Sequence, residues 1–150
     1  MSEREVILEA KNVTKIFRTT KGRPLTANDN VSLKIYKGET LGIAGESGCG
    51  KSTFIRMISL LDEPTSALDV TTQAQIIRQM MEMYRMSKTS IILVTHNLGV
   101  AAYMSDRILV MRNGRVVEQG DREKILHHPE SDYTVELLDA IPTMDGEIYV

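Results

Sequence analysis

The sequence of 150 residues has one cysteine, no excess of positive charge and no long hydrophobic run. The single cysteine, Cys49, excludes an intrachain disulfide, and we expect a reducing compartment. No apolar stretch approaches the roughly 20 residues that span a bilayer, and the N-terminal segment is too charged for a secretory signal. The net charge is −2, so the chain has no excess of basic residues of the kind that nucleic-acid binders carry. We therefore expect no nucleic-acid partner.

The remaining composition is that of an ordinary folded domain. Apolar residues make up 42% of the chain and charged residues 25%, which excludes a disordered composition. A chain of this length is expected to form one domain that buries roughly two-thirds of its unfolded surface. Two independent cores are not expected.

Hydrophobic patterning predicts alternating strands and helices, which is typical of an α/β fold. Strands are predicted at residues 6–17, 31–36, 41–44, 90–95, 107–111 and 115–119. Helices are predicted to start at Lys51 and after a cap at Asp69, and to cover residues 121–127 and 131–140. The pair Asn113-Gly114 predicts a tight hairpin turn between two of the strands.

Residues 45–53 fit the pattern G-x-x-x-x-G-K-[ST], which is typical of a loop that binds phosphate. Its glycines let successive backbone N–H groups curl around a phosphate chain at the start of a helix. We expect Lys51 to reach the β- and γ-phosphates of ATP and Ser52 to ligate Mg²⁺. The residues expected to hold ATP are Gly45, Glu46, Ser47, Gly48, Cys49, Gly50, Lys51, Ser52 and Thr53.

A pair of acidic residues follows at the end of an apolar run. Asp62 is expected to be the second acid of the metal site, and Glu63 the base for an attacking water. However, Asp62 comes only ten positions after Ser52, whereas a helical crossover between parallel strands takes at least about 10 to 12 residues. The spacing therefore predicts that the helix continues from Lys51 to about residue 61, leaving Asp62 away from the magnesium. A shorter helix followed by four extended residues also fits by rise per residue, but it leaves nothing for the turn.

Three ordered segments resemble the ATP-binding subunits of ABC transporters. Residues 45–53 are similar to the Walker A loop, residues 62–69 to Walker B with the D-loop, and residues 91–120 to the switch-histidine region with its hairpin. The tail at residues 120–142 is similar to the C-terminal extension of the oligopeptide, dipeptide and nickel importer branch, although Ser131-Asp132 stands where that branch commonly has His-Pro. The resemblance covers nearly all of the chain and implies a P-loop NTPase fold of the ABC type without its helical subdomain.

The resemblance also implies roles for residues beyond the phosphate loop. His96 would contact the γ-phosphate, Asp69 would communicate across a head-to-tail dimer, and Phe17 would stack on adenine. From the residues alone, a strand-end histidine bonded to a loop carbonyl is the favoured interpretation of His96. Phe17 can almost equally be a packing residue of an edge strand. Both alternatives stay open.

The implied cofactors are ATP and Mg²⁺. The implied partners are a second ATP-binding subunit, transmembrane permease subunits and an extracytoplasmic binding protein. The expected location is cytoplasmic, at the inner face of the membrane.

The chain departs from this family between its two Walker motifs. The family carries there a glutamine loop, a helical subdomain and an LSGGQ-like signature, whereas this sequence contains no Ser-Gly-Gly and has glutamines only at positions 73, 75, 79 and 119, in the wrong context. We hypothesise that residues 60–69 join two Pro-Thr-Ser copies across an internal deletion. One shortened domain is therefore predicted, with N-terminal strands and phosphate loop in residues 1–61, Walker B to switch region in 62–126 and the importer-type extension in 127–150.

The predicted function is the ATP-binding subunit of an importer for oligopeptides, dipeptides or nickel, in a shortened form. Hydrolysis is expected to be severely reduced, because such sites need the signature of one subunit against the Walker A loop of the other. Two other interpretations stay open. One is a non-catalytic nucleotide-binding remnant, and the other is an ABC protein of the DNA-repair or chromosome type.

Overall fold

A four-stranded sheet forms the centre of the protein. The computed structural model describes residues 4–20, 22–59 and 89–141, together with residues 82, 86, 143–144 and 147–148. Within these residues the sheet has the order β4 (Ile91–Thr95), β3 (Thr40–Ala44), β5 (Arg107–Arg112) and β6 (Arg115–Asp121). β4, β3 and β5 are parallel, and β6 returns antiparallel to β5. Parallel strands joined through helices are the mark of an α/β domain, so the predicted fold class is confirmed.

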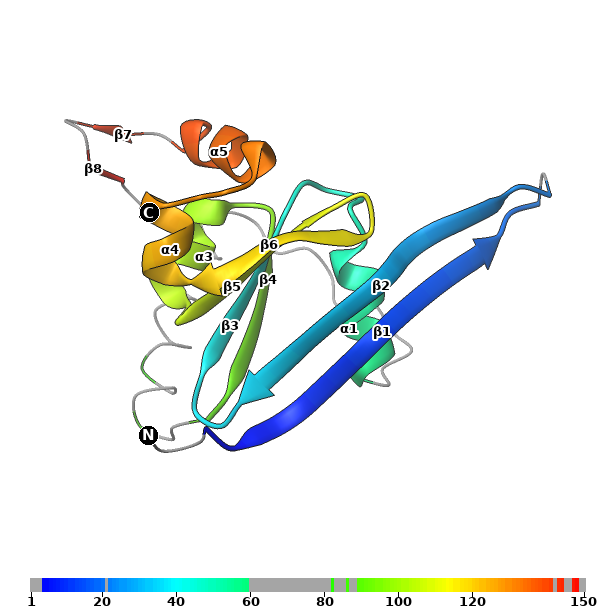
Figure 1. Ribbon diagram of the computed structural model, residues 1–150, viewed down its shortest axis with the longest axis horizontal. Coiled ribbons are helices and arrows are strands. Elements are labelled where there is room, and N and C mark those ends of the chain that lie inside the picture. The colour runs from blue at the N-terminus through cyan, green and yellow to red at the C-terminus, as the bar shows by residue number, and fades with distance from the viewer. Residues whose placement is uncertain are drawn as a thin grey trace.

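A long hairpin covers one face of this sheet. It consists of β1 (Val6–Arg18) and β2 (Pro24–Tyr36), and its outer part extends well beyond the sheet (Figure 1). Buried Val31, Leu33 and Ile35 alternate with exposed residues, so that β2 turns one apolar face inward. The prediction started this strand at residue 31, which was wrong. The polar residues before Val31 hide the strand pattern, but pairing with β1 continues outward to Pro24.

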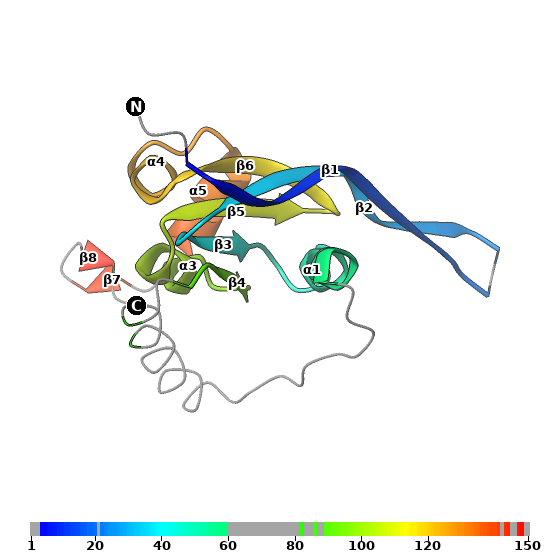
Figure 2. The same ribbon diagram turned by 90° about the horizontal axis from the view of Figure 1, so that it is seen from below.

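Two helices, both labelled in Figure 2, pack on the sheet. α1 (Lys51–Ser59) packs with the hairpin on the first face, whereas α3 (Leu98–Met104) covers the opposite face, against β3 and β4. The predicted start of α1 at Lys51 is confirmed. Its predicted continuation to residue 61, and the helix expected after Asp69, lie outside the described residues. α3 was not predicted, because its apolar and small residues show no polar face. Its one signal was Asn97, whose side-chain oxygen accepts hydrogen bonds from the backbone N–H groups of Gly99 and Val100.

Two short helices follow the sheet, as predicted. α4 (Arg122–His127) begins after Asp121, whose carboxylate caps it, and α5 (Asp132–Asp139) follows a short connection. A small antiparallel pair, β7 (Thr143–Met144) and β8 (Glu147–Ile148), comes last in chain order. No helix in the described part of the chain is long and apolar enough to cross a membrane.

The buried apolar residues form two clusters, one on each face of the central sheet. The first joins the hairpin to β3, β5 and α1, and Phe54 of α1 is completely buried in it. The second joins β3 and β5 to α3, α4 and α5, and includes Tyr133 at the start of α5. The loop between β3 and α1 is thus framed by packed elements on both sides.

Candidate nucleotide-binding site

The segment of residues 45–50 leaves the carboxyl end of β3 and enters α1. β3 lies between β4 and β5, and ligands of α/β sheets bind at such carboxyl ends. Ala44 pairs in parallel register with Thr95, so His96 begins at the same edge of the sheet. The fold therefore brings the predicted phosphate loop and the predicted switch histidine to one edge.

Glycines give the loop its backbone shape. Gly48 and Gly50 have φ angles of 81° and 98°, a region that residues with a side chain rarely adopt. A Cβ atom on Gly50 would lie 2.3 Å from the carbonyl oxygen of Ala27, whereas a Cβ on Gly48 would meet nothing within 4 Å. Gly50 is therefore required for a close approach of two backbones as well as for its conformation, and Gly48 only for its conformation.

Lys51 places its ammonium group inside the loop. Nζ donates hydrogen bonds to the carbonyl oxygens of Gly45 and Glu46, each at 2.6 Å, and lies 3.3 Å from Sγ of Cys49. The residue is only 7% exposed, so these carbonyl groups replace the water that its charge would otherwise need. The charge of Lys51 is thus held at the centre of the glycine-rich turn.

The outer side of the loop faces solvent. Glu46, Ser47, Gly48 and Ser52 are exposed, whereas Gly45, Cys49 and Lys51 are buried. The hydroxyl-bearing Ser52 lies in the first turn of α1, next to the buried ammonium group in sequence. A phosphate chain can therefore approach the exposed side of the loop while the buried lysine supplies positive charge from behind it.

The loop is supported from behind by β2 and by the turn between β5 and β6. The side-chain nitrogen of Asn28 donates to the carbonyl oxygen of Gly50 at 3.0 Å, and Gly114 N–H donates to the carbonyl oxygen of Cys49 at 2.9 Å. Gly114 in turn accepts from the backbone N–H of Asp29 at 2.9 Å. The predicted Asn113-Gly114 turn is confirmed, with φ angles of 49° and 77°. Its docking on the phosphate loop was not predicted.

Helix α5 contacts the loop through a tyrosine. The Tyr133 hydroxyl oxygen accepts a hydrogen bond from the backbone N–H of Glu46 at 2.9 Å. Burial raises the pKa of this hydroxyl, which keeps the phenol neutral. The Arg112 guanidinium lies over the ring, 4.6 Å from its centroid. Sequence reasoning had used Tyr133 only as part of the family likeness of the tail.

Comparison with known proteins identifies the family. A family model described as ABC transporter matches residues 28–136, which include the loop, its supports from β2 and the hairpin turn, and Tyr133. The chain belongs to the ABC transporter family. This confirms the family that the sequence motifs indicated.

Curated relatives place the likeness in the expected branch of ABC proteins. The oligopeptide transport ATP-binding protein OppD of Haemophilus influenzae is 49% identical over 87 residues, which are 58% of this chain and 27% of that protein. The glutathione import ATP-binding protein GsiA of Shigella flexneri is 34% identical over 143 residues, which are 95% of this chain and 22% of that protein. The chain therefore spans about a quarter of the length of these relatives.

Solved ABC cassettes share the fold. A bacterial ABC transporter cassette in its dimeric form superposes with a TM-score of 0.65 at 17% identity, covering 76% of this chain and 98% of that one. CbiO1 of Clostridium perfringens superposes with a TM-score of 0.63 at 14% identity, covering 84% and 92%. At such low identity, these likenesses support the ABC-type P-loop fold alone.

The ABC-type site is only partly assembled by the described residues. His96 is exposed at the end of β4, whereas Phe17 lies near the end of β1 on the extended part of the hairpin, 44% exposed and with its ring 5.2 Å from the Lys15 ammonium (Figure 1). The predicted Asp62, Glu63 and Asp69 lie outside the described residues. Within the described residues no group of three or more His, Cys, Asp or Glu could hold a metal ion. Of the two predicted Mg²⁺ ligands, Ser52 is among the described residues and Asp62 is not.

A buried carboxylate fixes the helix that carries Tyr133. Glu118 of β6 accepts hydrogen bonds from the backbone N–H groups of Glu130 at 2.8 Å and Ser131 at 3.1 Å. Ser131 occupies the cap position of α5 but makes no side-chain cap bond of its own. Burial alone would raise the pKa of Glu118, but the nearby Thr134 hydroxyl and the two N–H groups outweigh it and hold the pKa below the ordinary 4.5. Glu118 therefore acts as an anionic cap for α5.

Replacing Glu118 by glutamine is expected to lower the free energy of unfolding at neutral pH by about 1.5–3 kcal/mol, because charged hydrogen bonds to two part-buried N–H groups are lost. The pKa of Glu118 is lower in the folded state than in the unfolded state, so its stabilisation is complete above pH 4.5 and disappears as the pH falls through the folded value. Urea unfolding at a series of pH values measures this difference.

The matched control for Glu118 is Glu123→Gln, on the exposed side of α4. That variant loses exposed ion pairs with Arg122 and His127 and should unfold within about 0.5 kcal/mol of the parent at every pH. A Glu118→Gln deficit that stays constant from neutral pH to well below 4.5 would contradict the anionic cap.

Proposed function

We propose that this chain binds MgATP in the loop of residues 45–53 and is a shortened ATP-binding subunit of an importer for oligopeptides, dipeptides or nickel. The observation that carries the proposal is the buried ammonium group of Lys51, held at the loop centre by the carbonyls of Gly45 and Glu46. The curated relatives named oligopeptide and dipeptide transport ATP-binding proteins support the choice of cargo.

The proposed roles of the other residues are those that the family resemblance implies. Exposed Ser52 in the first turn of α1 suits a hydroxyl ligand for Mg²⁺. The family resemblance implies Asp62 as the carboxylate ligand, whereas its short spacing from Ser52 predicts a place away from the magnesium. The bound Mg²⁺ would neutralise charge on the β- and γ-phosphates. His96, which follows β4 at the same sheet edge, is proposed to contact the γ-phosphate. Glu63 is proposed to polarise water, and Asp69 to act across a dimer.

The proposed domain is a single ABC unit that has lost the block between its Walker motifs. Its parts are residues 1–61, 62–126 and 127–150. Without a glutamine loop and a signature motif, hydrolysis is severely reduced and coupling to transport is lost. In the intact system the partners are a second ATP-binding subunit, permease subunits and an extracytoplasmic binding protein, at the cytoplasmic face of the membrane.

Replacing Lys51 by methionine is expected to weaken MgATP binding at least tenfold, or about 1.4 kcal/mol, because the phosphates lose a charged partner while the side-chain volume is kept. Isothermal titration calorimetry of the purified chain with MgATP measures the affinity. A thermal unfolding scan with and without MgATP gives an independent readout, since a ligand that binds the folded state raises the unfolding temperature.

Lys37→Met is the matched control, since Lys37 is an exposed lysine whose ammonium group pairs with Glu5 at the surface. It should bind MgATP like the parent. Equal affinity of Lys51→Met and the parent, or no binding by a folded parent, would refute the proposed site. Turnover of MgATP by the parent at the ordinary rates of ABC ATPases, with Lys51→Met inactive, would refute the proposed loss of hydrolysis.

A further inference from the structure

Tyr133 and Lys51 hold opposite ends of the same peptide group. The peptide between Gly45 and Glu46 offers its N–H to the Tyr133 hydroxyl at 2.9 Å, and its carbonyl oxygen to Nζ of Lys51 at 2.6 Å. A peptide group is planar, so its N–H and C=O cannot turn independently. Any rotation of this plane that breaks the bond to Tyr133 also moves the carbonyl that holds the lysine.

We propose that Tyr133 is a positioning residue for the phosphate loop, through which helix α5 sets the affinity for nucleotide phosphates. The inference rests on the proposed nucleotide-binding function and assigns a part of that function to the C-terminal helix. Tyr133 touches neither the proposed phosphate position nor Mg²⁺, and it acts through the peptide that orients Lys51.

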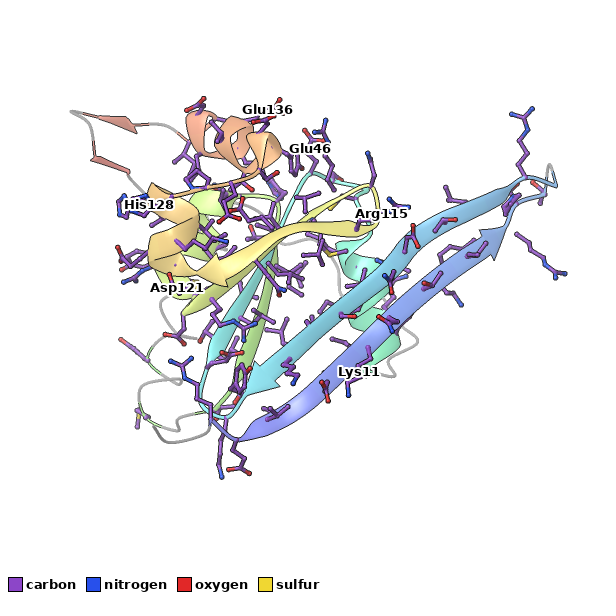
Figure 3. The ribbon with its side chains drawn as sticks, viewed as in Figure 1. Lys11, Glu46, Arg115, Asp121, His128 and Glu136 are labelled. Carbon is purple, nitrogen blue, oxygen red and sulfur yellow. The ribbon has the colours of Figure 1, made fainter. Side chains whose placement is uncertain are left out.

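The tyrosine is itself held rigidly. Its side chain is 3% exposed and belongs to the cluster that joins α5 to β3 and α3, and Arg112 covers its ring. The start of α5 is fixed by the Glu118 carboxylate. Figure 3 shows the exposed Glu46 beside α5. A single hydrogen bond from this rigid side chain can therefore fix the peptide of a loop whose outer side faces solvent.

The hydroxyl group is the part of Tyr133 that the packing does not need. The buried ring contributes to the apolar cluster, but the oxygen serves the Glu46 N–H. A phenylalanine at this position would keep the ring and leave that N–H without its protein partner. Tyr133→Phe therefore removes the hydrogen bond that positions the loop and keeps the packing of the ring.

The test compares Tyr133→Phe with the parent in titrations with MgATP. We expect the affinity to fall about three- to tenfold, the size of one hydrogen bond of roughly 1 kcal/mol expressed as a dissociation constant. Tyr36→Phe is the matched control. The Tyr36 ring also lies under an arginine, with Arg107 5.2 Å from its centroid, but Tyr36 is the last residue of β2 and not part of α5. This control should bind MgATP like the parent.

A second readout does not depend on nucleotide. Amide hydrogen exchange followed by NMR should be faster at Glu46 in Tyr133→Phe, while the amides of β3 exchange as in the parent. Unchanged exchange at Glu46, together with unchanged affinity for MgATP, would overturn the inference and leave the proposed binding site intact. If the folded parent fails to bind MgATP, the proposed function fails, and the exchange rate at Glu46 still decides whether Tyr133 positions the loop.

Glu118→Gln supplies a second variant that leaves Tyr133 in place and loosens the start of its helix. We expect a smaller loss of MgATP affinity in the same direction. The combined variant with Tyr133→Phe should bind no more weakly than Tyr133→Phe alone, since the connection is already broken. If the losses of MgATP affinity in the two single variants simply add in the combined variant, Glu118 does not act through Tyr133. An unchanged affinity in Glu118→Gln, despite its lower stability, would contradict the inference in the same way.

Discussion

Replacement of Gly50 by alanine should lower the free energy of unfolding by about 2–4 kcal/mol and abolish MgATP binding. At a φ angle of 98° a side chain is strained wherever it points. The added Cβ would also lie 2.3 Å from the carbonyl oxygen of Ala27 and 2.9 Å from the side-chain nitrogen of Asn28. Neither atom can move away freely, because one is backbone of β2 and the other is the buried support of the loop.

Gly48→Ala separates these two causes. Gly48 also has a positive φ angle, 81°, but an added Cβ would meet nothing within 4 Å. Its cost should be that of the left-handed conformation alone, about 1–2 kcal/mol. Urea unfolding of both variants and the parent measures the difference. Equal costs at the two positions would show that the close approach of β2 to the loop is not needed for stability.

The local chemistry of the loop could be predicted from the sequence. A glycine-rich segment ending in Lys51-Ser52 predicts its own turn and the start of α1, because glycine conformation and helix initiation depend on neighbouring residues. The buried strands β3 and β5 were also predicted from short apolar runs. The outer half of β2 was not, because its pairing with β1 decides the structure of a polar segment.

The supports of the loop could not be predicted, because each of them comes from a distant part of the chain. Asn28 bonds to a residue 22 positions away, and Tyr133 to one 87 positions away. A polar residue in a strand and a tyrosine at a helix start are each compatible with many environments. Their hydrogen-bond partners are decided by the folded arrangement. A single sequence does not say which distant groups meet in it.

The positions of these supports fit the proposal that this chain keeps a phosphate loop after losing the block between its Walker motifs. Asn28 precedes the loop, whereas Gly114 and Tyr133 follow the described strand β4. One contact joins Asn28 to the loop from the N-terminal side, and the other two join Gly114 and Tyr133 to it from the C-terminal side. None of the three involves the segment between α1 and β4. A deletion in that segment would remove groups that act on the nucleotide without removing these groups that shape its loop.

The two phenylalanines of the chain allow stability and binding to be tested separately. Phe54 is completely buried in the cluster of α1, β3 and the hairpin, and Phe54→Ala is expected to lower the free energy of unfolding by about 3–5 kcal/mol. Phe17 is 44% exposed, and the same substitution there should cost about 1 kcal/mol or less. The measurement is urea unfolding, with the parent as reference.

The effect of Phe17 on nucleotide binding tests whether its ring stacks on adenine, as the family resemblance implies. Phe17→Ala should then lower the affinity for MgATP about threefold or more, and leave the affinity for inorganic tripolyphosphate unchanged, because only the base meets the ring. A Phe17→Ala variant that binds both ligands like the parent would assign Phe17 to the hairpin alone. In that case adenine would have no aromatic partner in β1, since Phe17 is the only phenylalanine of that strand, and the phosphate loop would have to supply most of the affinity.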